Sequence, residues 1–282
     1  MKLQETSVLA FCAAMCALIS ACTTDPRTHA NAIAQAADLR REQIAAGAFL
    51  LTTYVRLSDV GLPLTVYIEG DGLAWQTRNQ PSDDPTPRKP MGLRLAAADR
   101  SANVIYLARP CQYTPLGDSP YCNVTYWTGK RFAPEVVAAM DEAITHYMAR
   151  MPGQRANLVG YSGGAAIAVL LAARRHDVAS LRTVAGNLDH DAVNRFHHVA
   201  LMPDSLNPAD VATSVANIPQ IHFAGSDDTI IPPMIVHGFA SKVGACAQDR
   251  VIEGLSHEGA WDVLWPQLLA LRPRCAPEEA SR

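Results

Sequence analysis

The sequence predicts an α/β fold in which helices cover both faces of a mostly parallel central sheet. From residue 64 onward, short apolar segments alternate with helical segments, which is typical of βαβ units. The apolar segments show no alternation of polar and apolar residues, so both faces of each strand are expected to be buried. With 282 residues, 49% of them hydrophobic and 18% charged, the chain can form one domain with a sizeable core.

Individual elements follow from composition and from helix and turn signals. Residues 30–44 are alanine-rich with apolar side chains on one side, which predicts a surface helix, and residues 75–90 carry four prolines, which predicts a loop. The segment at residues 188–219 has room for a short cap but not for a large lid domain. We expect strands at residues 48–57, 64–68, 103–107, 156–161, 181–185, 220–224 and 250–252, and further helices at 91–99, 134–151, 165–173 and 259–271.

One turn in this pattern points to chemistry: Gly160-Tyr161-Ser162-Gly163-Gly164 lies between a predicted buried strand and an apolar helix. A G-x-S-x-G turn in this setting lifts the serine hydroxyl above the sheet, and it needs glycines because larger side chains would collide with the strand and helix. It also aims the backbone N–H of Gly163 at an oxyanion that forms beside Ser162. A glycine-flanked serine is otherwise usually only a turn, so it is the flanking elements that make Ser162 a candidate nucleophile.

The N-terminus has the pattern of an export signal. Lys2 precedes an apolar run at residues 8–19, which is too short for a stable transmembrane helix. The run ends in Leu18-Ile19-Ser20-Ala21-Cys22, which resembles a bacterial lipobox, whose cysteine is lipidated and becomes the first residue. The alternative is a plain signal peptide with a chance cysteine. We expect a lipoprotein signal peptide at residues 1–21, a tether and N-terminal helix at 22–47, the main domain at 48–275 and a C-terminal tail at 276–282.

The lipobox also predicts a location at the cell envelope. Thr23, rather than aspartate, follows Cys22, which points to the outer membrane. We therefore expect a lipid anchor in that membrane and a domain that faces the periplasm. Acyl chains at one terminus would anchor the protein stably, because each buried CH₂ group contributes roughly 0.8 kcal/mol.

The cysteine content agrees with export. Two of the seven cysteines lie in the predicted signal, and Cys22 would carry lipid. The remaining four suggest two disulfides in an oxidising compartment, with three possible connectivities. The spacings favour the pairs Cys111–Cys122 and Cys246–Cys275, and the chain lacks the paired C-x-x-C spacing of a metal site.

Candidate partners for Ser162 follow later strands. A serine hydroxyl is a poor nucleophile near neutral pH and needs a histidine base, which a carboxylate orients. In open α/β sheets such groups gather beyond the carboxyl ends of the strands. Two acids, Asp227 and Asp228, directly follow the predicted strand at residues 220–224, and His257 follows the last predicted strand. The chain order of serine, acid and histidine is that of α/β-hydrolases.

The chain resembles an α/β-hydrolase over most of its length after the signal. In that family the acid often stands three residues after a glycine and just before an apolar-apolar-proline step. Asp228 fits this register after Gly225, whereas Asp227 comes one residue early. The resemblance therefore implies a catalytic triad of Ser162, Asp228 and His257.

The resemblance also implies a second oxyanion donor in a loop after an earlier strand. Where many relatives have His-Gly, this chain has Glu69-Gly70, followed by Asp71-Gly72. We expect the N–H of Asp71 to serve with that of Gly163, and the N–H of Gly72 to be the second choice. Because an inward carboxylate would oppose a negative oxyanion, we expect the Asp71 side chain to turn away. The alternative is that these residues form only a tight turn.

Other classes of site have less support. The formal net charge of −3, without a run of like charges, gives no electrostatic footprint for nucleic acid. The sequences Asp189-His190-Asp191 and His197-His198 look like metal ligands, but histidines beside acids in loops are commoner than metal sites. We expect neither a metal nor a cofactor.

A closer resemblance concerns Glu69-Gly70-Asp71-Gly72 with Trp75 after it, and the sequences at residues 84–87, 107–113 and 184–189. These are similar to a group of bacterial lipoproteins described only as α/β-hydrolases, which implies a fold and a location but no substrate. We expect a serine hydrolase that acts on a carboxylic ester, with a small-molecule or acyl-ester substrate. A peptidase or an acyltransferase would use the same groups. A non-catalytic envelope lipoprotein is the alternative of another class, and it would not need all three triad residues.

Overall fold

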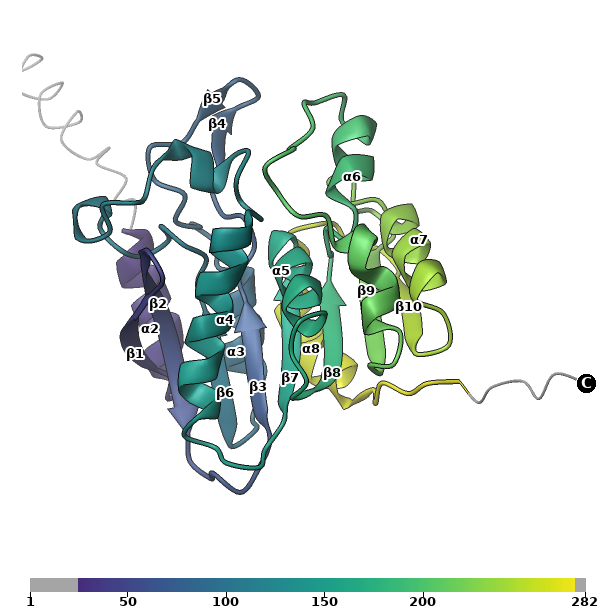
Figure 1. Ribbon diagram of the computed structural model, residues 1–282, viewed down its shortest axis with the longest axis horizontal. Coiled ribbons are helices and arrows are strands. Elements are labelled where there is room, and N and C mark those ends of the chain that lie inside the picture. The colour runs from purple at the N-terminus through teal and green to yellow at the C-terminus, as the bar shows by residue number, and fades with distance from the viewer. Residues whose placement is uncertain (1–24, 277–282) are drawn as a thin grey trace, which may run out of the picture.

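A computed structural model describes residues 25–276, in which one eight-stranded sheet carries the fold (Figure 1). The strand order is β1-β2-β6-β3-β7-β8-β9-β10. The pairs β1–β2 and β2–β6 are antiparallel, and all other neighbours are parallel. The strands are β1 (Arg40–Ala46), β2 (Phe49–Leu57), β3 (Leu64–Ile68), β6 (Asn103–Leu107), β7 (Ala156–Tyr161), β8 (Val178–Val184), β9 (Gln220–Gly225) and β10 (Ala247–Ile252).

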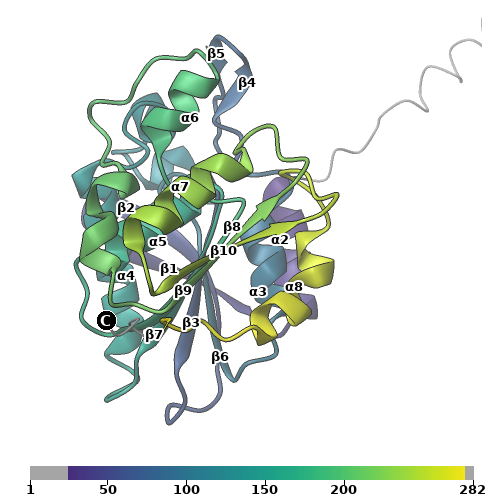
Figure 2. The same ribbon diagram turned by 90° about the vertical axis from the view of Figure 1, so that its right-hand side faces the viewer.

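Helices cover both faces of this sheet, so the predicted fold class is confirmed (Figure 2). One face carries α2 (Pro26–Ala36), α3 (Met91–Ala98) and α8 (Trp261–Ala270). The other face carries α4 (Pro134–Met148), α5 (Gly163–Ala172), α7 (Pro233–Val243) and the 3-10 helix η3 (Pro208–Val215). No helix within residues 25–276 is long and apolar enough to cross a membrane.

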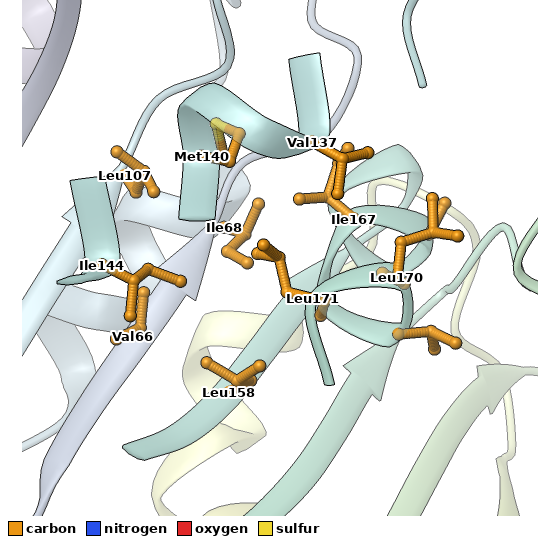
Figure 3. Packing of buried hydrophobic residues seen from close by; sticks show 14 of the residues in the cluster. Val66, Ile68, Leu107, Val137, Met140, Ile144, Leu158, Ile167, Leu170 and Leu171 are labelled. Carbon is orange, nitrogen blue, oxygen red and sulfur yellow. The ribbon is translucent and has the colours of Figure 1, made fainter. Parts of the chain in front are cut away.

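The larger core cluster lies between the central strands and the pair α4 and α5 (Figure 3). Its strand residues are apolar on this face, and α5 is buried along its whole length, which explains why its sequence is apolar all round. This packing holds the first turn of α5 firmly against the end of β7. The labelled side chains are Val66, Ile68, Leu107 and Leu158 from the strands, Val137, Met140 and Ile144 from α4, and Ile167, Leu170 and Leu171 from α5.

The N-terminal region differs from the prediction of a helix over residues 30–44. Helix α2 ends at Ala36, and Asp38 has a φ of 56°, which turns the chain into β1. Strand β1 then pairs with β2, and it buries Ile44 and Ala46 while the residues between and beside them are exposed. The alanine content favours a helix locally, but pairing with β2 buries the alternate side chains. The predicted signal peptide and Cys22 lie outside the described residues, as does most of the predicted tail.

Several loops gather beyond the carboxyl ends of the parallel strands (Figure 1). The predicted loop at residues 75–90 contains a small hairpin of β4 (Trp75–Thr77) and β5 (Gln80–Pro81). The segment at residues 188–219 contains α6 (His190–Phe196) and η3, and it adds no separate lid domain. The structure contains both predicted disulfides, Cys111–Cys122 and Cys246–Cys275.

Candidate active site

Ser162 stands on a sharp turn between β7 and α5. Its φ is 51° and its ψ is −121°, a conformation that L-residues rarely adopt. Close backbone packing explains the flanking glycines: a Cβ atom on Gly164 would lie 2.3 Å from the carbonyl oxygen of Ile68, and one on Gly160 would lie 2.4 Å from that of Gly164. The Ser162 N–H donates to the carbonyl of Val184 at 3.0 Å. The strained turn is thus fixed by its surroundings, and it leaves the serine partly exposed.

The three residues that the sequence predicts as a triad lie in one hydrogen-bonded chain. His257 Nε2 is 3.0 Å from Ser162 Oγ, and His257 Nδ1 is 2.8 Å from Asp228 Oδ2. The other oxygen of Asp228 accepts from the backbone N–H groups of Ile230 and Ile231 at 2.9 and 2.8 Å. Because the Asp228 side chain is fully buried, these bonds fix its orientation toward the histidine.

The neighbouring acid does not reach the histidine. Asp227 is exposed, and it accepts a hydrogen bond from the hydroxyl of Ser226 at 2.9 Å. The geometry therefore assigns the orienting position to Asp228. With Asp228 accepting at Nδ1, the Nδ1–H tautomer of His257 leaves Nε2 free to accept the proton of Ser162.

Two aromatic residues that the sequence did not single out hold the His257 loop. The Tyr161 hydroxyl and the Trp261 indole N–H both donate to the carbonyl of His257 at 3.1 Å. The Tyr161 ring centroid is 5.4 Å from the imidazole. Burial, and next the Glu69 carboxylate, raises the pKa of Tyr161 far above its ordinary value, so its hydroxyl stays a donor. Tyr161 occupies the variable position of the G-x-S-x-G turn, which gave no signal of this role.

The turn after β3 borders the nucleophile. A Cβ on Gly70 would lie 3.2 Å from Ser162 Cβ. The Gly70 N–H is already used, since it donates to the side chain of Glu69 at 2.9 Å. Within residues 25–276, the N–H groups of Asp71, Gly72 and Gly163 have no acceptor. These three are the predicted oxyanion donors, and each is free for an incoming oxygen.

Packing distinguishes the two candidates in this turn. Gly72 has a φ of 66°, and a Cβ there would lie 2.1 Å from the carbonyl oxygen of Pro85. Gly72 thus packs against the loop before α3, whereas Asp71 directly follows the residue that contacts Ser162. This arrangement favours the N–H of Asp71 as the partner of the Gly163 N–H.

Glu69 takes the place where many relatives have histidine, and it is fully buried. Its carboxylate accepts from the N–H of Gly70, from that of Gly92 at 3.0 Å and from that of Leu93 at 3.3 Å. Burial raises the pKa of Glu69, and the three backbone donors offset part of this rise. Since Gly92 and Leu93 open α3, Glu69 ties the oxyanion turn to the positive end of that helix.

The Asp71 carboxylate does not turn away from the elbow, which corrects the prediction. It fills the space beside Gly163, where a Cβ would lie 2.0 Å from Asp71 Oδ1. Arg109 donates to Oδ1 at 3.1 Å, and Arg131 donates to Oδ2 at 2.8 Å. Burial alone would raise the pKa of Asp71, but the two guanidinium groups outweigh it and hold the pKa below its ordinary value. The prediction considered only repulsion by a lone carboxylate and missed the two arginines.

The histidines that looked like metal ligands have other surroundings. The ring of His190 is buried and stacks on Phe132 with 5.8 Å between centroids. Asp189 caps α6 by accepting from the N–H of Ala192, and His197 Nε2 lies 2.8 Å from the carbonyl oxygen of Ile230. Among the described residues, no three histidine, cysteine or acidic side chains gather as metal ligands would.

Solved structures with a similar fold are numerous. No protein-family model matches this chain, and no curated protein matches it in sequence. An α/β serine hydrolase homologue from Coxiella burnetii matches 81% of this chain and 92% of its own at 16% identity, with a TM-score of 0.56. A serine hydrolase without a lid from Xanthomonas campestris matches 83% and 97% at 14% identity, with a TM-score of 0.51. An esterase from Pyrococcus furiosus matches 83% and 89% at 13% identity, with a TM-score of 0.54.

The comparisons and the sheet topology together define the fold class. This chain has the α/β-hydrolase fold, with Ser162, Asp228 and His257 following β7, β9 and β10 at the carboxyl edge of the sheet.

Proposed function

We propose that this protein is a serine hydrolase that cleaves carboxylic esters. The observation that carries this proposal is the continuous hydrogen-bonded chain from Ser162 through His257 to the buried Asp228. Two backbone N–H groups beside the serine, those of Gly163 and Asp71, lack acceptors within the described chain. A nucleophile, a base, an orienting acid and two oxyanion donors are the parts that acyl transfer needs.

The proposed reaction has two stages. His257 Nε2 takes the proton of Ser162 Oγ as that oxygen attacks the ester carbonyl, and the N–H groups of Gly163 and Asp71 stabilise the oxyanion. When the carbon–oxygen bond to the alcohol breaks, His257 gives its proton to the leaving oxygen, and the acyl group stays on Ser162. Water then attacks the acyl-enzyme with His257 as base again, which releases the acid and restores the serine.

A peptidase or an acyltransferase would use the same groups, and the resemblance to an esterase and to serine hydrolases supports the ester. A non-catalytic binding protein is the alternative without chemistry. Hydrolysis of 4-nitrophenyl esters of increasing acyl length separates these outcomes. We expect turnover that falls up to about a million-fold in Ser162→Ala and stays near wild type in Ser214→Ala, an exposed serine of η3. Equal rates for wild type and Ser162→Ala would reject the proposal.

We also propose that Cys22 carries the lipid anchor and that the domain faces the periplasm from the outer membrane. The lipobox pattern and the two disulfides support this location. Arg27, close to the start of the described chain, binds Asp84 at 2.8 Å in the loop after β5. The intact mass of protein from the membrane fraction should show a diacylated or triacylated Cys22, and Cys22→Ser should lose that mass. An unmodified N-terminus at another residue would contradict the anchor.

A further inference from the structure

A small ionic cluster lies beside the elbow and has no part in the reaction just described. Its members are Asp71, Arg109 and Arg131, which come from the turn after β3, the segment after β6 and the segment before α4. The Asp71 carboxylate touches the position beside Gly163, so the cluster directly adjoins the oxyanion donors. It also lies two residues from the Cys111–Cys122 loop, since Arg109 is two residues before Cys111.

The cluster holds one positive charge in excess. The two arginines keep the pKa of Asp71 below its ordinary value, so the carboxylate is ionised at neutral pH. Burial lowers the pKa of Arg109, but a guanidinium group stays protonated in proteins. One carboxylate therefore faces two cations.

Other acids near the site do not cancel this excess. Glu69 is buried on its three backbone N–H donors, and Asp228 is bound to His257. Glu258 is exposed and pairs with Lys89 at 3.1 Å. The excess charge is thus left for a ligand or for solvent.

Hydrogen-bond donors of the cluster are also unused. Arg109 donates to Asp71 and to the carbonyl of Arg131, and it lies over the Phe132 ring, but its buried Nε has no partner among residues 25–276. Arg131 uses Nε for the carbonyl of Thr128 and Nη1 for Asp71. Its side chain is 19% exposed, and its Nη2 donates to no described group. A partly exposed guanidinium with a free edge suits a carboxylate, whose two oxygens match its donors.

We propose that Arg131, held by Asp71 and Arg109, forms a subsite for a carboxylate on the substrate, so that the preferred ester carries an acidic group close to its scissile carbonyl. This inference rests on the proposed function, because it names the substrate class of the same site. A cation next to the oxyanion donors attracts a second anionic group of the same molecule and positions its carbonyl over Ser162.

Two esters with the same leaving group test the subsite: neutral 4-nitrophenyl butyrate and the mono-4-nitrophenyl ester of glutarate, which adds one carboxylate. The measured quantity is the ratio of kcat/KM for the acidic ester to that for the neutral ester. Arg131→Gln should lower this ratio about ten- to hundredfold, because it removes a charge-assisted hydrogen bond. Asp71→Asn should raise the ratio, because it leaves two cations without their carboxylate.

The opposite signs distinguish recognition from a purely structural role. If the cluster only held the turn in place, both substitutions would loosen the same contacts and move the ratio in the same direction or not at all. Arg174→Gln is the matched control, since Arg174 is exposed beyond the end of α5 that is remote from Ser162. It removes the same charge and should leave the ratio unchanged.

Binding of glutarate tests the subsite without hydrolysis. Calorimetry with the Ser162→Ala protein should show binding that becomes at least about tenfold weaker when Arg131→Gln is added. Hydrolysis of the neutral ester with no shift in the ratio, or no glutarate binding, would overturn the subsite and leave the hydrolase intact. Glutarate binding that depends on Arg131 in a protein that cleaves neither ester would instead overturn the proposed function.

Discussion

The elbow at Ser162 and the turn at Glu69–Gly72 face each other across the ends of β7 and β3, but different forces shape them. The elbow is held by backbone packing, in which Gly160 and Gly164 leave no room for a Cβ atom. The turn is held by polar side chains: Glu69 binds the N–H groups at the start of α3, and Gln112 donates to the Gly70 carbonyl at 2.9 Å. The nucleophile is therefore positioned by local geometry, and the proposed oxyanion donor by residues distant in the chain.

This difference has an energetic consequence. A steric clash in the elbow cannot be relieved without moving β7, β3 or α5, because protein interiors are close-packed. A lost ionic or polar contact in the turn leaves a buried group unsatisfied, but the turn itself can adjust. We expect damage to the elbow to act on fold and activity together, and damage to the turn to be graded.

The largest effect should come from the acid that orients the base of the elbow. Asp228→Asn should lower kcat about ten-thousandfold, because an amide favours the wrong histidine tautomer. Asp227→Asn should change kcat only slightly, since Asp227 is exposed and contacts Ser226 instead. Steady-state kinetics on a 4-nitrophenyl ester measure both, and similar losses in the two variants would remove Asp228 from the triad.

The elbow itself should not tolerate a single methyl group. Gly164→Ala places a Cβ 2.3 Å from the Ile68 carbonyl oxygen and 2.4 Å from that of Glu69, so we expect a loss of at least about 3 kcal/mol of unfolding free energy. Gly238→Ala in α7 is the control, because no atom lies within 4 Å of its Cβ position and alanine favours a helix. Urea denaturation gives both values, and equal stability of the two variants would show that the elbow has slack.

The turn should respond in a coupled manner. Arg109→Met should lower the free energy of unfolding by about 3 kcal/mol, since it leaves Asp71 with one partner in a buried site. Adding Asp71→Asn should cost less in this background than in wild type, by about 1 kcal/mol or more. A double-mutant cycle from urea denaturation measures the coupling, and strictly additive effects would show that the pair contributes nothing as a pair.

The Cys111–Cys122 disulfide should support the turn indirectly. Its loop carries Gln112, which binds Gly70. The double substitution Cys111→Ser with Cys122→Ser should lower stability by about 2–3 kcal/mol and should also raise KM, because the turn loses a fixed neighbour. Thermal unfolding and kinetics measure the two effects. Recovery of both cysteines as separate alkylated thiols from unreduced protein would remove the basis of this prediction.

The smallest effect concerns pH. The folded pKa of Asp71 lies below its ordinary value, so its ion pairs stabilise the fold above the unfolded pKa, near 4. This contribution is lost as the pH falls through the folded pKa. The stability difference between wild type and Asp71→Asn should therefore shrink between pH 5 and about pH 2. A difference that stays constant over this range would mean that Asp71 is not the titrating group.

The sequence was sufficient where the signal is local. The apolar strands, the elbow glycines, the register of Asp228 after Gly225 and the loop position of His257 are short-range patterns, and the structure places those groups together. The cysteine spacings also gave the two pairs that the structure contains. In each case the residues that matter lie within one turn, loop or strand end.

The failures have the opposite character. Residues 40–46 form β1 although their neighbours favour a helix, because β2 supplies the pairing. Helix α7 was not predicted, and the loop at residues 75–90 was taken as irregular although it contains the β4–β5 hairpin. The Asp71 side chain was expected to turn away, because Arg109 and Arg131 are 38 and 60 residues distant and no local pattern connects them.

Covalent labelling tests the central claim, that Ser162 is an activated nucleophile, without any assumption about the substrate. A fluorophosphonate should modify the wild-type protein once per chain, on the peptide that contains Ser162, because His257 and Asp228 activate this hydroxyl. Ser162→Ala should remain unlabelled under the same conditions. Labelling of Ser162→Ala at the wild-type rate, or a folded wild-type protein that takes up no label, would contradict the account.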